Sequence, residues 1–112
     1  MEKLEEDVIA PIELDLTIAR RGELDESMLR RFGTVVKWML NRMFGSSNKM
    51  FRVRGTQRDL DSFAKTLGGE KKYMEAYLKY GLNDPRTLSN RHRLEAAISG
   101  FESETGIKWP IK

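Results

Sequence analysis

Cysteine is absent from the 112 residues, and histidine occurs once. Without a thiol, the chain has no disulfide, no thiolate zinc ligand and no cysteine nucleophile. No apolar run approaches the ~18 residues of a transmembrane helix, and the acidic first residues are unlike a secretory signal, which is basic and then apolar. We therefore expect a soluble, intracellular product without a signal peptide or membrane span.

Charge is abundant but unevenly distributed, although the formal net charge is only +3. Residues 1–19 carry six acidic residues against one lysine, and residues 20–58 carry ten Lys or Arg against three acidic residues. This basic block, residues 20–58, is suited to phosphate, to an acidic protein surface or to the acidic N-terminal arm, residues 1–10. Net charge does not rank the three partners.

Residues 25–44 predict a central amphipathic helix, the element around which the fold is built. Apolar side chains recur at helical spacing on one broad face: Met28, Leu29, Phe32, Val35, Val36, Met39, Leu40 and Met43. Burying five or six of them, at roughly 1.5 to 3 kcal/mol each, outweighs the ~1 kcal/mol cost of Gly33 inside the helix.

Two short segments on either side of this helix alternate between apolar and polar residues, as half-buried strands do. They are residues 12–18 and 50–54, the second with Phe51 and Val53 inward and Arg52 and Arg54 outward. A helix between two strands suggests a right-handed parallel crossover. Two strands make a thin sheet, and the candidate sources of a third strand are the C-terminal tail, residues 107–112, and a partner subunit.

The second half of the chain predicts three more helices. Thr56 and Asp59 form a capping-box start, Gly68-Gly69 is expected to break that helix, and a further helix follows over residues 70–80. After Gly81 and the Asn83-Asp84-Pro85 turn, a last helix is entered through Thr87 or Ser89 and ends at Gly106. Trp109 and Ile111 are expected to fasten the tail to the body.

The expected fold is therefore α+β and mostly helical, in a single domain of residues 1–112. It has the order strand, helix, strand and three helices, arranged around the long central helix, with a small sheet of two or three strands. No internal repeat or coiled-coil heptad series is visible.

Catalytic chemistry has little support in this sequence. The only histidine, His92, is flanked by Arg91 and Arg93, which disfavour the imidazolium that a general base must form. Glu95 lies one helical turn on and is able to orient the ring, but no nucleophile accompanies the pair. We expect a surface or structural histidine and a protein that is not an enzyme, with no metal, cofactor or small-molecule substrate.

Arginines gather near the expected start of the last helix, where the helix dipole disfavours positive charge by roughly 0.3 to 1 kcal/mol per group. An anion bound at this helix start by Arg91 and Arg93 would offset that cost. The alternative is that these arginines pair with the chain's own acidic residues, and we favour it because exposed ion pairs are common.

Trp38 falls on the polar face of the central helix and not on its apolar stripe. An aromatic residue among arginines either stacks on a nucleobase or anchors a protein interface, unless the tail or the N-terminal arm covers it. The candidate residues for an interface or an anion site are Arg30, Arg31, Lys37, Trp38, Arg42, Arg52, Arg54, Arg91 and Arg93.

Six segments carry a resemblance to a known family: residues 22–27, 42–45, 51–56, 70–75, 80–87 and 105–112. With them the chain resembles a family of small, functionally uncharacterised proteins encoded by tailed bacteriophages. The segments are caps, turns and core positions, so the resemblance implies shared fold and origin and supplies no active-site residues. It also implies a location in the cytoplasm of an infected cell or in the virion.

Two functions follow as hypotheses. The first is a structural or assembly protein of a phage, a non-enzymatic protein that acts through contacts with a protein partner or with further copies of itself. The alternative is a nucleic-acid-binding accessory protein whose basic block lies on phosphates.

Overall fold

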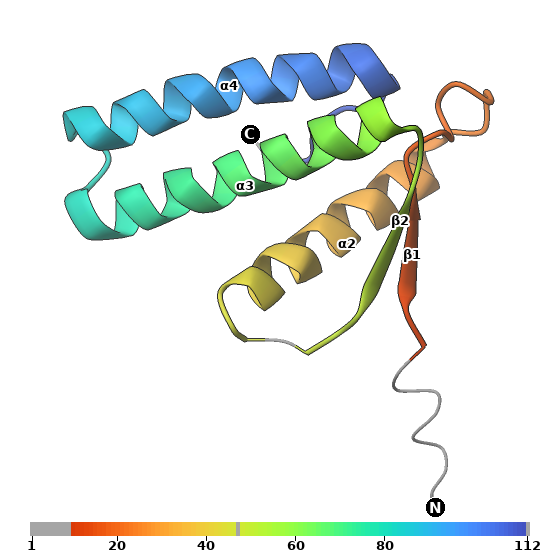
Figure 1. The fold of residues 1–112 in the computed structure, drawn as a ribbon, viewed down its shortest axis with the longest axis horizontal. Helices are drawn as coiled ribbons and strands as arrows, with labels where there is room; N and C mark the ends of the chain where they lie inside the picture. Colours follow the sequence, from red (N-terminus) through yellow and green to blue (C-terminus); the bar gives the residue numbers. More distant parts are fainter. Residues whose placement is uncertain (1–9, 47, 112) are drawn as a thin grey trace, which may run out of the picture.

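The computed structural model describes residues 10–46 and 48–111 (Figure 1). In chain order these residues form β1 (Ile12–Asp15), α2 (Glu26–Met43), β2 (Phe51–Arg54), α3 (Gln57–Tyr80) and α4 (Pro85–Thr105). Figure 1 shows α3 and α4 side by side as a long hairpin, with α2 and the two strands beneath them. The predicted α+β, mostly helical fold is confirmed.

The two strands pair in parallel, with Ile12 opposite Phe51 and Asp15 opposite Arg54, and α2 makes the predicted crossover between them. β1 is shorter than the predicted strand 12–18, because the side chain of Asp15 accepts hydrogen bonds from the backbone N–H and the hydroxyl of Thr17 (2.9 and 2.7 Å). An aspartate that bonds backbone two residues ahead turns the chain. Leu16 and Ile18 are nevertheless buried, as the alternation predicted.

Helix α2 is the predicted central helix. Asp25 caps its first turn by accepting from the backbone N–H of Met28 (2.8 Å). Phe32, Val35, Val36 and Leu40 are buried. The apolar stripe ends at solvent, however, because Met43 at the C-terminal end of the helix is 38% exposed.

One continuous helix, α3, replaces the two predicted on either side of Gly68-Gly69, so the expected break is wrong. A methyl group on Gly69 would lie 3.5 Å from Cδ1 and 3.7 Å from Cα of Leu94. These are ordinary contact distances, so Gly69 lies at the contact between α3 and α4 without being required there by space, and the packing of the two helices outweighs the ~1 kcal/mol that a glycine costs inside a helix. The predicted capping box of Thr56 and Asp59 is confirmed, with both hydrogen bonds present (2.9 and 3.1 Å).

Helix α4 begins earlier than Thr87 or Ser89, at Pro85, with Asp84 as its N-cap. It ends as predicted at Gly106, whose left-handed backbone (φ 75°) suits glycine.

The tail after α4 folds back into the core. Trp109 is fully buried in an aromatic cluster with Phe32, Phe63 and Phe101, at ring-centroid distances of 5.3 to 6.4 Å. Gly33 leaves room for this tail, since a methyl group there would lie 3.2 Å from Cβ of Pro110. The predicted fastening of the tail is confirmed, whereas residues 107–111 add no third strand to the sheet.

Candidate functional site

At least six of the ten cations in the basic block pair with the chain's own carboxylates. Arg52 and Arg54 on β2 both face Glu13 on β1, at 3.5 and 3.7 Å. Arg30 lies 3.8 Å from Glu26, one turn earlier on α2. Further ion pairs join Arg20 to Asp59, Arg21 to Asp15 and Glu23, and Arg58 to Glu104. Phosphates would have to compete with these carboxylates, so the pairing does not favour the nucleic-acid alternative.

Arg20 is the arginine of this block that pairs with a fully buried carboxylate. Its guanidinium donates to both carboxylate oxygens of Asp59 (2.9 and 2.5 Å) and to the backbone carbonyl of Glu104 (3.1 Å). Asp59 is itself fully buried. The hydrogen bonds from Arg20 hold the pKa of Asp59 below its usual range, against the opposing effect of burial. Arg20 therefore joins the turn after β1 to α3 and α4, which is a structural role.

On α2, the outer face carries Arg31, Lys37 and Trp38 as predicted. Trp38 stays 37% exposed in the part of the chain that is described, and its ring lies beneath the ammonium of Lys49 (5.1 Å to the centroid). The tail does not cover it, because Trp109 is buried on the core side of α2. The idea that the N-terminal arm covers Trp38 concerns residues 1–9, which lie outside the described residues.

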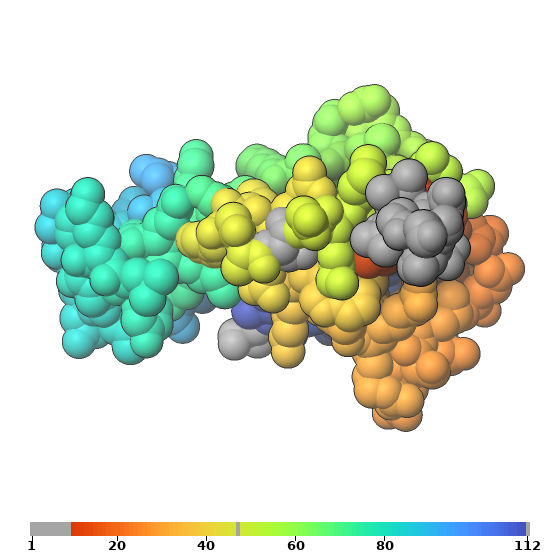
Figure 2. Space-filling view, turned by 90° about the horizontal axis from the view of Figure 1, so that it is seen from below, coloured from red at the N-terminus to blue at the C-terminus, as the bar shows by residue number. Residues whose placement is uncertain are grey.

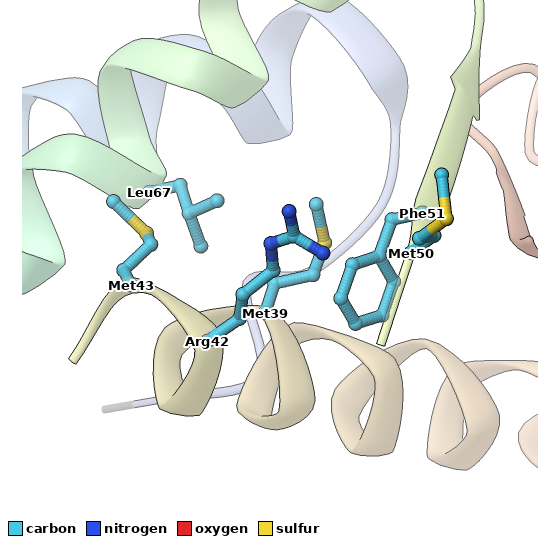
Figure 3. Close-up of a pocket in the computed structure, with 6 residues that line it drawn as sticks. All are labelled: Met39, Arg42, Met43, Met50, Phe51 and Leu67. Carbon is cyan, nitrogen blue, oxygen red and sulfur yellow. The ribbon is translucent and has the colours of Figure 1, made fainter. Parts of the chain in front are cut away.

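Exposed apolar side chains gather where α2 ends and β2 begins. Beyond Trp38 they are Met43, Phe44 and Met50, which are 38, 41 and 52% exposed. We call these four residues the α2-end patch. Met43 and Met50 line a groove of about 360 Å³ that is walled by α2, by the start of β2 and by Leu67 of α3 (Figure 3), whereas Trp38 and Phe44 are not among its lining residues. Figure 2 looks onto this side of the molecule, with the tip of the α3–α4 hairpin extending beyond it.

Methionine dominates this groove, which contains Met39, Met43 and Met50. The methionine side chain is flexible and polarisable, so it adapts to partners of different shape. Methionine is enriched at promiscuous binding surfaces. Arg42 also lines the groove, and its guanidinium donates to the backbone carbonyl of Lys49. The groove is thus apolar with one cation, the arrangement that receives an apolar side chain next to an acidic one.

Sequence reasoning identified Trp38 and Arg42 but missed Phe44 and Met50. Met43 was assigned to the core, because helical spacing does not show where the rest of the protein stops covering an apolar stripe. The available signal was the density of Met and Phe between residues 39 and 51.

The arginines of α4 do not converge on an anion site. Arg91 pairs with Glu95 (3.3 Å), which confirms the favoured alternative for that residue and leaves His92 exposed without Glu95 as its orienting partner. Arg93 lies on another side of the hairpin, in a groove of about 350 Å³ that Lys65 and Lys72 also line. The candidate residues therefore occupy several separate surfaces.

Among residues 10–46 and 48–111, no group of three acidic or histidine side chains is arranged to hold a metal ion. No helix in the same ranges is long and apolar enough to cross a membrane. Comparisons of the chain with protein-family models, with curated proteins and with solved structures gave no match.

Proposed function

We propose that this chain is a non-enzymatic binding protein that works through protein–protein contacts at the α2-end patch. The observation that supports the proposal is the Met-lined groove, in which Met43 and Met50 are exposed, with Trp38 and Phe44 also exposed in the C-terminal half and at the end of α2. Apolar side chains clustered around a groove are characteristic of interaction sites, whereas single exposed apolar residues are common on any surface.

The expected partner surface is apolar with an acidic rim. Lys49 stands over Trp38, and Lys71 stands over the ring of Phe44 at 5.4 Å, so cations border the aromatic part of the patch. Arg42 adds a cation within the groove. Complementary charges at the rim raise association rates and select partners, while the apolar centre supplies most of the affinity.

The resemblance to small proteins of tailed bacteriophages supplies the biological setting for this proposal. The chain then acts as a virion or assembly component, in the cytoplasm of the infected cell or in the particle. The partner is another phage protein or a second copy of the chain.

Site-specific photocrosslinking tests the proposal. A photoreactive residue is placed at Met50, and a matched control is placed at Leu82, which is equally exposed (51%) but lies in the turn after α3. In cells that produce the phage proteins, position 50 is expected to give one or a few discrete protein adducts that position 82 does not give. The adducted partner is then purified for affinity measurements.

Trp38→Ala is the first affinity variant. We expect its Kd for that partner to rise by about 30-fold or more, the equivalent of about 2 kcal/mol, as at other aromatic hot spots. The thermal midpoint of the isolated chain should change little. Identical adduct patterns at positions 50 and 82 contradict the proposal, and adducts to nucleic acid at position 50 support the nucleic-acid alternative in its place.

A further inference from the structure

A second and larger pocket lies on the α3–α4 hairpin, beside the end of the tail. Its volume is about 590 Å³, against about 360 Å³ for the groove at the α2-end patch. That volume falls within the about 300 to 1,000 Å³ typical of ligand sites. Its walls combine the carboxylates Glu70, Glu95 and Glu102 with the apolar or aromatic side chains of Tyr73, Ile98 and Ile111.

Glu70 is the unusual member of this pocket, because only 2% of its surface is exposed. The indole N–H of Trp109 donates to Oε1 of Glu70 at 3.0 Å. Among the described residues, no further donor and no cation within ion-pair distance is found for this carboxylate, which is able to accept about four hydrogen bonds. A buried carboxylate with one neutral donor is costly in its charged form, unless a cation joins it or it takes up a proton.

Among residues 10–46 and 48–111, the charged groups around Glu70 do not supply that cation. Glu102 accepts from the backbone N–H of Trp109 (2.8 Å), and Glu95 pairs with Arg91. Of the described residues that line the pocket, Arg91 carries the one guanidinium, and it already faces the exposed carboxylate of Glu95 on its own helix. Because these carboxylates do not form a metal-binding group, the pocket suits an organic cation better than a metal ion.

We propose that this pocket binds a guanidinium or alkylammonium group, as carried by an arginine or lysine side chain. The cationic end lies against Glu70, and the aliphatic stem lies along Ile98, Ile111 and Tyr73. Long cationic side chains bury their methylene stems on apolar surface in this way. The site is separate from the α2-end patch and goes beyond the function proposed above.

A purely structural role for Glu70, as an acceptor for Trp109, predicts a different result. A glutamine at position 70 presents the same carbonyl oxygen to the indole without burying a charge. Glu70→Gln therefore keeps the fold and removes the attraction for a cation, and this separates the two roles.

The experiment is an NMR titration that follows the indole N–H signal of Trp109 at constant ionic strength. The probe is Nα-acetyl-arginine amide, and the matched neutral probe is Nα-acetyl-citrulline amide, which has nearly the same shape without the charge. The second indole signal, from Trp38, is assigned with Trp38→Phe. We expect the arginine probe alone to shift the Trp109 signal, saturably, with a Kd on the order of 1 mM.

In Glu70→Gln, the Kd for the arginine probe is expected to rise at least about tenfold, the equivalent of 1.4 kcal/mol. The control Glu75→Gln changes an exposed carboxylate on α3 that pairs with Lys71 away from the pocket, and should leave the Kd unchanged. Lys112→Gln removes the cation that follows Ile111 in the sequence, so an unchanged or tighter Kd agrees with the proposal and a loss of binding contradicts it.

Equal shifts with the citrulline probe, an unchanged Kd in Glu70→Gln, or no saturation at about 50 mM probe would overturn the proposal. The source of the cation is resolved by a further pair of probes. Tighter binding of a blocked Ala-Arg-Ala peptide indicates the side chain of a protein partner, and tighter binding of free arginine indicates a small metabolite.

Discussion

Two buried carboxylates on helix α3, Asp59 and Glu70, differ in the hydrogen-bond donors that surround them. Asp59, in the first turn of α3, is held by Arg20 through two hydrogen bonds (2.9 and 2.5 Å) and by the backbone N–H of Thr56 (2.9 Å). Glu70, about three turns further along, has the single indole N–H of Trp109. The pair shows that donors, and not burial alone, decide whether a buried carboxylate is stabilising.

The pKa values of the two groups move in opposite directions for this reason. Hydrogen bonds from Arg20 lower the pKa of Asp59 and outweigh the effect of burial. Burial raises the pKa of Glu70, and the hydrogen bond from Trp109 only partly opposes it. The carboxylate of Asp59 thus finds a cationic donor within the chain. Among the described residues, the carboxylate of Glu70 has unused hydrogen-bond acceptor positions, to which a cationic ligand could donate.

The largest effect on the free energy of unfolding is expected at Trp109, which packs in the core and also donates a hydrogen bond to Glu70. Trp109→Ala removes a fully buried ring from the aromatic cluster and the only hydrogen-bond donor found for Glu70 among the described residues. We expect a loss of about 3 to 5 kcal/mol in the free energy of unfolding, measured by urea denaturation. Trp38→Ala is the matched control and should cost under about 1 kcal/mol, since its ring is partly exposed. If Trp109→Ala lowered the free energy of unfolding by as little as Trp38→Ala is expected to, the tail would contribute little to the stability of the core.

An intermediate effect on the free energy of unfolding is expected at Asp59. Asp59→Asn removes a capping acceptor and weakens charged hydrogen bonds to Arg20, which we expect to cost about 2 to 3 kcal/mol at pH 7. The expected loss is limited because the Arg20 side chain is 39% exposed, so water solvates its guanidinium when residue 59 is neutral.

The pH dependence of Asp59→Asn provides the check. Because the folded pKa of Asp59 is lowered, its contribution is present above the unfolded pKa of about 4 and is lost as pH falls through the folded pKa. The difference between wild type and Asp59→Asn should therefore shrink in urea denaturation below about pH 4. A difference that stays constant with pH would assign the whole effect to helix capping.

The smallest effect, with the opposite sign, is expected from Glu70→Gln. The folded pKa of Glu70 is raised, so the wild-type protein loses stability as pH rises from the unfolded value of about 4.3 through the folded pKa. Glutamine has no such loss. At pH 7 and without ligand we expect the variant to be up to about 1 kcal/mol more stable, with the difference disappearing below about pH 4. Destabilisation at pH 7 would mean that Glu70 already has a cationic partner within the chain.

Much of the fold could be predicted because its signals are local. The stripe on α2, the alternation in β2 and the capping box at Thr56 each lie within a few residues of sequence. The glycines at 68 and 69 misled the prediction, because the continuity of α3 depends on its packing against α4, where Gly69 lies beside Leu94. Local propensity indicated a break, and packing between helices decided otherwise.

The candidate site was less predictable. The position of Trp38 on the polar face of α2 predicted that its ring lies outside the core, but left open whether the tail or the N-terminal arm covers it. The burial of Glu70 was not predicted, because a glutamate inside a helix is almost always solvent-exposed. Its burial results from Trp109, 39 residues later in the chain, and no periodicity within α3 carries that information.

The contacts of Arg20 also bear on the order in which the molecule folds. They connect residues 39 and 84 positions apart in sequence, whereas α3 and α4 are joined by a turn of only four residues, 81–84. Closing a short loop costs less entropy than closing a long one, so we expect the hairpin to form early and the Arg20 junction to form after the folding transition state. Interactions that form after the transition state govern the rate of unfolding, so Arg20 acts mainly on the lifetime of the native state and little on the speed at which it is reached.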